Sequence, residues 1–136
     1  MIINLGSHND KFGDCCFDPR DGTPAAWIYD GEIEIGGEGD ATSHRLSDGK
    51  QTVPCFDFSQ WLAKLDRPKD DEIIVKMDIE GAEYEVLPKM LEDGTISLVQ
   101  ELIIEWHDWK VGVEKVETKR LTALIKQAGV RILRWK

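Results

Sequence analysis

The sequence predicts an α/β fold with a mostly parallel sheet, a β-hairpin and helices on both faces of the sheet. Two short apolar runs, at residues 73–77 and 102–104, are typical of strands that are buried on both faces. A helical spacing of apolar residues follows each run, at residues 82–91 and 116–128. Because parallel strands are joined by right-handed helical crossovers, we expect these two strands to lie parallel.

The composition predicts one domain that spans residues 1–136. The 17 basic residues against 26 acidic residues give a net charge of −9 without a basic stripe, so we expect neither nucleic acid nor an anionic membrane as a partner. No apolar run approaches the roughly 20 residues of a membrane-spanning helix, and the N-terminus has no signal pattern. We therefore expect a cytoplasmic protein, in which Cys15, Cys16 and Cys55 are reduced thiols.

Residues 1–24 form the least regular part of the chain. Residues 1–6 have the pattern of a short strand that ends in a glycine turn, and turn-forming residues dominate from Ser7 to Pro24. A helix and a second strand need about 15 residues or more, and the segment before Phe17 is shorter than that. We therefore expect the first strand–helix–strand unit to be degraded or absent. A second copy or a partner chain would then complete the exposed edge of the sheet.

Residues 25–35 have the pattern of a β-hairpin. An apolar, aromatic run comes first, Asp30-Gly31 is a strong turn signal, and polar and apolar residues then alternate. Glycines break this alternation, so we expect residues 36–50 to form a loop.

The pattern of residues 52–60 predicts an extended segment followed by the start of a helix. Residues 52–56 are extended in pattern, and Pro54 places them at a sheet edge or at the start of a strand. Asp57 has the position of a helix N-cap, with Gln60 at the capping-box spacing, so we expect Asp57 to be structural.

The strand at residues 73–78 and the helix after it form the centre of the predicted fold. Gly81 allows a sharp turn between them, and Glu80 and Glu83 suit the positive end of the helix dipole. Pro88 is expected to kink or restart the helix, because it lacks an N–H group and clashes with the preceding turn. A polar loop at residues 108–114 and a final strand at residues 130–135 complete the chain.

Ionisable side chains follow both buried strands. Asp78 and Glu80 come after the first, and Glu105 and His107 come after the second. Neighbouring parallel strands lie about 4.8 Å apart and end at one edge of the sheet, so we expect these four side chains to lie close together.

Three roles are open for this cluster. His107 or Asp78 has the chemistry of a general base that takes the proton of a hydroxyl group. Asp78, Glu105 and His107 also have ligand types for a divalent ion, although we assign no metal. The third role is structural, with Glu80 and Glu83 at a helix start and Glu105 paired with a basic residue. We favour function for Asp78, Glu105 and His107, and leave both roles open for Glu80 and Glu83.

The run Lys76-Met77-Asp78-Ile79-Glu80-Gly81-Ala82-Glu83, followed by Glu105-Trp106-His107, resembles the signature of the FkbM family of S-adenosylmethionine-dependent methyltransferases. The resemblance covers roughly residues 25–136 and is closest over residues 73–107. It implies a partial or compact Rossmann-like methyltransferase sheet and S-adenosylmethionine as the cofactor. It also implies O-methylation of a hydroxyl on a sugar or natural product, with the loop at residues 36–50 facing the substrate.

The resemblance extends to individual site residues. It implies catalytic roles for Asp78, Glu80, Glu105 and His107. It implies cofactor binding by Gly6, Asp18, Asp78, Gly81 and Glu83. Near the N-terminus, Asn4-Leu5-Gly6 resembles the family's cofactor loop, with Asn4 in place of an acid and Asp10 in place of a glycine.

Two other functions are compatible with the same residues. One is a catalytically inactive methyltransferase remnant that acts as a binding or assembly module. The other is a metal-dependent hydrolase that uses the acidic edge of the sheet.

Overall fold

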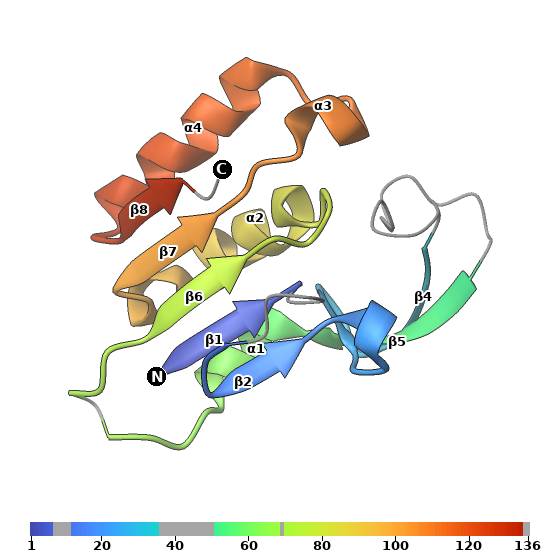
Figure 1. Cartoon of the computed structure of the whole chain (residues 1–136). Helices are drawn as coiled ribbons and strands as arrows, with labels where there is room; N and C mark the ends of the chain where they lie inside the picture. Colours follow the sequence, from blue (N-terminus) through green and yellow to red (C-terminus); the bar gives the residue numbers. More distant parts are fainter. Residues whose placement is uncertain (7–11, 36–50, 69, 135–136) are drawn as a thin grey trace.

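The computed structural model describes residues 1–6, 12–35, 51–68 and 70–134 (Figure 1). The predicted loop at residues 36–50 and Asp10 lie outside the described residues. The strands are β1 Ile2–Leu5, β2 Cys15–Phe17, β3 Ala25–Trp27, β4 Gly31–Ile35, β5 Gln51–Asp57, β6 Ile74–Met77, β7 Glu101–Ile104 and β8 Arg131–Arg134. The α-helices are α1 Phe58–Ala63, α2 Glu83–Asp93, α3 Asp108–Val111 and α4 Lys115–Gln127, and 3-10 turns lie at Pro19–Asp21 and Thr95–Leu98.

Five strands form the main sheet in the order β2-β1-β6-β7-β8, and every neighbouring pair is parallel. This confirms the α/β class and a compact Rossmann-like sheet. The register places Leu5 beside Met77, and Met77 beside Ile104, so that three central strands end level. The residues that follow these ends meet at one edge of the sheet, as Figure 1 shows.

The N-terminal strands differ from the prediction. β1 and β2 are both present and parallel, and β1 lies between β2 and β6, so of the two predicted alternatives this unit is not absent but shortened. The shortening is real: the described part of the connection contains no helix. This segment packs on β1 directly, because Asp14 N donates to Ile2 O at 2.8 Å. Gly13 permits that approach, since a Cβ there would lie 2.8 Å from the Ile2 side chain.

Among the described helices, α1, α2 and α4 pack on one face of the main sheet. One core cluster joins a single face of the strands to α1, α2 and α4; its members include Ile3, Leu5, Val75, Met77, Leu102, Ile104, Phe58, Leu62, Val86, Leu87, Met90 and Ile125. We expected helices on both faces, and the structure differs in this respect. The cause is the short β1–β2 connection, because a helix in that crossover would cover the opposite face.

A second sheet has three strands in the order β3-β5-β4. The predicted hairpin over residues 25–35 was wrong, because β3 and β4 both pair with β5 and not with each other. The prediction of an edge strand at Pro54 was also wrong, since β5 is central. Pro54 is tolerated there because it pairs with β4 alone: the ladder with β3 begins one residue later, at Cys55.

The helix ends agree better with the sequence-based predictions than the helix interiors do. Asp57 is the N-cap of α1 and accepts a hydrogen bond from Gln60 N at 3.0 Å. Pro88 lies inside α2, which runs on to Asp93 without a restart. A short helix, α3, replaces part of the predicted polar loop. None of the described helices is long and apolar enough to cross a membrane.

Candidate active site

The site begins where β1, β6 and β7 end together. Asp78 N donates to Leu5 O, and Glu105 N donates to Met77 O, both at 3.0 Å, so the ladders continue one residue past each strand. Gly6 has a φ of +78°, and a Cβ there would lie 1.7 Å from the carbonyl oxygen of Asp78. Only glycine therefore allows the end of β1 to pack against the backbone of Asp78.

Glu83 fixes the turn after β6 and the histidine after β7. Its side chain is fully buried, and Oε2 accepts a hydrogen bond from Gly81 N at 3.1 Å. Oε1 accepts from His107 N at 2.7 Å and lies 2.9 Å from His107 Nδ1. The turn requires a positive φ at two successive residues, 58° at Glu80 and 105° at Gly81. Glu83 is thus a positioning residue for the site.

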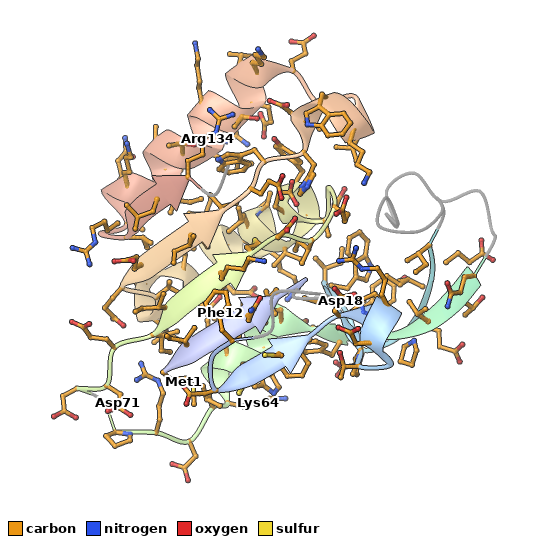
Figure 2. All side chains as sticks on the ribbon, viewed as in Figure 1. Met1, Phe12, Asp18, Lys64, Asp71 and Arg134 are labelled. Atoms are coloured by element: carbon orange, nitrogen blue, oxygen red, sulfur yellow. The ribbon has the colours of Figure 1, made fainter. Side chains whose placement is uncertain are left out.

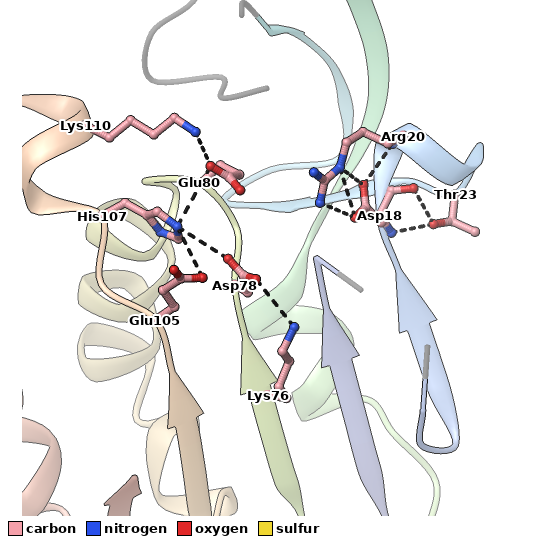
Figure 3. A network of polar contacts seen from close by, with 9 residues as sticks. All are labelled: Asp18, Arg20, Thr23, Lys76, Asp78, Glu80, Glu105, His107 and Lys110. Carbon is pink, nitrogen blue, oxygen red and sulfur yellow. Dashed lines mark hydrogen bonds and ion pairs between the residues drawn. The ribbon is translucent and has the colours of Figure 1, made fainter. Parts of the chain in front are cut away.

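His107 is the centre of a cluster of carboxylates, as Figure 3 shows. Its Nε2 lies 3.4 Å from Asp78 Oδ1, 3.7 Å from Glu105 Oε2 and 3.8 Å from Glu80 Oε2. All four residues that the sequence predicted as catalytic therefore come together. Glu80 also forms an ion pair with Lys110.

The cluster shifts the protonation of its central residues. Burial disfavours the charged imidazole, but Asp78, Glu83 and Glu80 outweigh it and raise the pKa of His107 to about 10. Burial also disfavours the Asp78 carboxylate, but His107, Glu105 and Lys76 outweigh it and lower the pKa of Asp78 to about 2. At neutral pH these shifts favour the charged form of both His107 and Asp78, which makes Asp78 the better candidate for the general base.

Three of these residues have the geometry of a metal site. Asp78, Glu105 and His107 each offer a ligand atom, and these atoms lie within 4.8 Å of one another. A divalent ion would bind there only if His107 gave up the proton on Nε2, because an imidazolium cannot ligate a metal.

A small cavity lies on the other side of Asp78, at the ends of β1 and β2. Its volume is about 30 Å³, and Gly6, Asp18 and Asp78 line it together with Phe17 and Ile79. Three of the predicted cofactor residues are thus brought together. Gly81 and Glu83 do not line this cavity, since Glu83 faces His107.

The carboxylate of Asp18 is already engaged in an ion pair. Its side chain is 2% exposed, and Arg20 contacts it through Nε at 3.1 Å and through Nη2 at 2.7 Å. Thr23 and the following turn hold the backbone of Asp18 in place (Figure 3). The sequence analysis missed Arg20 and Lys110. The only signal for them was a basic residue two or three positions after a predicted site residue.

The residues around the cavity suit an adenosyl cofactor in chemistry, although not in enclosed volume. Asp78 Oδ1 is buried and lies 3.4 Å from His107 Nε2, but it accepts no well-aligned hydrogen bond from a described residue, so it can still accept one from a bound donor. Phe17, Ala26 and Ile79 supply apolar walls. The cavity itself has room for about two water molecules, so most of a cofactor would lie over the open edge.

Comparison with known proteins assigns this arrangement to a family. No curated protein and no solved structure matches the chain. The family model described as the methyltransferase FkbM domain matches residues 6–132. That range includes both strand ends that carry the carboxylates and His107. The chain therefore belongs to the FkbM methyltransferase domain family.

Proposed function

We propose that the chain is an S-adenosylmethionine-dependent O-methyltransferase that acts on a hydroxyl group of a small molecule, such as a sugar or natural product. The observation that carries the proposal is the position of Asp78. Asp78 lines the cavity and pairs with His107, and its Oδ1 is a buried acceptor without a well-aligned hydrogen bond from a described residue. Family membership supports methyl transfer, and this acceptor atom supports a hydroxyl as the recipient.

The cofactor would supply an electrophilic methyl group, and Gly6, Asp18 and Asp78 are the residues that would hold it. Gly6 keeps the end of β1 close to Asp78, so no side chain blocks the cavity there. Asp18 would accept hydrogen bonds from ribose hydroxyls only after Arg20 moves from its carboxylate. We therefore expect a change in the Asp18–Arg20 pair when the cofactor binds.

Asp78 would orient the acceptor and take its proton. A neutral hydroxyl would donate to Oδ1, and this hydrogen bond would orient the acceptor oxygen. Methylation would turn that oxygen into a protonated ether, which is a far stronger acid than a carboxylic acid. Proton transfer to Asp78 is then favourable even though the pKa of Asp78 is lowered to about 2.

His107 and the remaining carboxylates would support Asp78. The imidazolium stabilises the Asp78 anion before the reaction, and Glu83 holds the ring in place. Glu105 lies on the other side of Nε2, at 3.7 Å, and can relay the proton to solvent because its side chain is 28% exposed. Glu80 would hold Lys110 at the entrance.

The setting fits a small acceptor in a reducing compartment. The net charge of −9 disfavours nucleic acid as the acceptor. Cys15, Cys16 and Cys55 are free thiols, which supports action in the cytoplasm.

The test is formation of S-adenosylhomocysteine over a panel of sugars, phenols and hydroxy acids. We expect turnover with at least one hydroxyl compound, and a loss of about 100-fold or more in Asp78→Asn, which keeps the shape but removes the base. Asp66→Asn is the matched control, because Asp66 is exposed on the loop before β6. Turnover that is unchanged in Asp78→Asn would contradict the assigned role.

A non-catalytic remnant is the second candidate, and the buried Asp18–Arg20 pair favours it, because that pair occupies the predicted ribose site. A remnant would bind no cofactor. Failure to bind S-adenosylhomocysteine in a folded protein would therefore select this reading.

A further inference from the structure

A basic groove runs from the end of β7 along α4. Two adjoining hollows form it, with volumes of about 440 Å³ and 490 Å³, and both are lined by Trp106, Thr118, Lys119 and Arg134. Pockets for small molecules have volumes of about 300–1,000 Å³, so either hollow is large enough for one. The groove lies at the carboxyl ends of parallel strands, where α/β proteins bind ligands.

The charge of this groove is opposite to that of the whole chain. Four basic residues line the two hollows, namely Lys115, Lys119, Lys126 and Arg134, against two acidic residues, Glu105 and Asp108. The chain itself has a net charge of −9. In the described part of the chain, none of the four basic groups forms an ion pair, whereas Lys76, Lys89 and Lys110 all do. These four cations are therefore not required by the fold.

The groove is continuous with the candidate active site. Glu105 lines the first hollow, and its Oε2 lies 3.7 Å from His107 Nε2. Trp106 and Trp109 also line this hollow, and Trp109 is 77% exposed. A ligand that reaches from Glu105 to Lys119 would therefore lie against aromatic surface.

We propose that this groove binds an anionic group of the methyl acceptor, a phosphate or a carboxylate, while the hydroxyl of the acceptor reaches Asp78. The acceptor class is thus a phosphorylated or carboxylated small molecule. This assignment rests on the proposed function for the identity of the acceptor, but the anion site is testable without a methyl donor.

The test is titration of the full chain with pyrophosphate and, separately, with malonate at low salt. The readout is the indole N–H signals of the five tryptophans in a ¹H–¹⁵N spectrum. We expect saturable shifts of the Trp106 and Trp109 signals, with little change at Trp27, which packs in the small sheet. The anion with the tighter binding identifies the phosphate or the carboxylate as the recognised group.

Charge-reversal variants distinguish anion binding in the groove from non-specific electrostatic attraction of the anion to the protein. We expect Lys119→Glu and Arg134→Glu each to raise the dissociation constant about tenfold or more, a change of about 1.4 kcal/mol. Lys64→Glu is the matched control, since it alters the net charge equally and Figure 2 shows Lys64 far from Arg134. It should change the dissociation constant less than about twofold, because exposed charges at that distance are screened.

The outcomes separate this proposal from the proposed function. The proposed anion site would be overturned if neither anion gave a saturable shift of the Trp106 and Trp109 signals. It would also be overturned if Lys64→Glu weakened binding as much as Lys119→Glu and Arg134→Glu do. Groove-dependent binding of an anion supports it, even if S-adenosylhomocysteine does not bind and the methyltransferase reaction is rejected.

Discussion

The two halves of the sheet edge are built in different ways. At the ends of β6 and β7, four ionisable side chains surround His107, and a buried Glu83 holds the histidine in place. At the end of β2, the carboxylate of Asp18 forms an ion pair with Arg20. No helix is described in the connection between β1 and β2. The first half gathers carboxylates around one buried histidine, whereas in the second the buried acid already has a basic partner.

This difference bears most on cofactor binding at the β1–β2 edge, which the proposed function requires. At the β6–β7 edge, Asp78 Oδ1 is a buried acceptor that pairs with His107 Nε2 but has no well-aligned hydrogen bond from a described residue. The β1–β2 edge has an enclosed volume of only about 30 Å³. Gly6 links the halves, since it allows β1 to pack against Asp78. The predictions below test this contrast.

The largest effect is expected from Gly6→Ala. The new Cβ would lie 1.7 Å from Asp78 O, so the two edges must separate or the protein must unfold. We expect a loss of about 3 kcal/mol or more in the free energy of unfolding, measured with urea. Gly22→Ala is the control, because Gly22 has a similar φ of +83° but open space around it. It should cost only about 1–2 kcal/mol, and equal losses would contradict the close packing at Gly6.

Glu83→Ala should have the next largest effect. It removes the buried carboxylate that bonds to Gly81 and His107, and leaves these groups without a partner. We expect a loss of about 3 kcal/mol in the free energy of unfolding. Glu92→Ala, on the exposed side of α2, should change it by less than about 0.5 kcal/mol. If the two variants were equally stable, Glu83 would not organise the site.

The pH dependence of stability tests the charge of His107. Folding raises its pKa from 6.5 to about 10, so the folded state binds this proton more tightly. The stabilisation is fully present below pH 6.5 and is lost as the pH rises through about 10. The free energy of unfolding should therefore fall over this range in the wild type. His107→Gln should show a smaller fall, and identical slopes would rule out a charged His107.

Arg20→Gln should have the smallest effect on stability. Asp18 loses the guanidinium but still accepts a hydrogen bond from the backbone N–H of residue 20, at 2.9 Å. We expect a loss of about 1–2 kcal/mol in the free energy of unfolding, smaller than for Glu83→Ala. A larger loss than for Glu83→Ala would reverse the contrast between the two edges.

The sequence predicted the β6–β7 half well, because periodicity and strand order decide it. Two apolar runs joined by a helix must be parallel, and that alone brought Asp78, Glu105 and His107 together. The state of His107 was not predictable. Its pKa depends on three carboxylates, those of Asp78, Glu80 and Glu83, and sequence order does not give their distances from the imidazole.

The sequence predicted the N-terminal half and the small sheet poorly. Length rules argued against a helix between β1 and β2, but they did not show that Gly13 lets the described end of this connection pack on Ile2. The Asp30-Gly31 signal indicated a local hairpin, yet β3 and β4 each pair with the distant β5. Non-local pairing outweighed the local turn preference in this region.

The most direct test of the central claim is calorimetric titration of the purified chain with S-adenosylhomocysteine. We expect a micromolar dissociation constant, at least about tenfold weaker in Asp78→Asn and unchanged in Asp66→Asn. That result would show that the β1–β2 edge opens to hold the cofactor beside Asp78. No binding at millimolar ligand, in a protein that unfolds cooperatively, would contradict the account and leave a methyltransferase edge that has lost its cofactor.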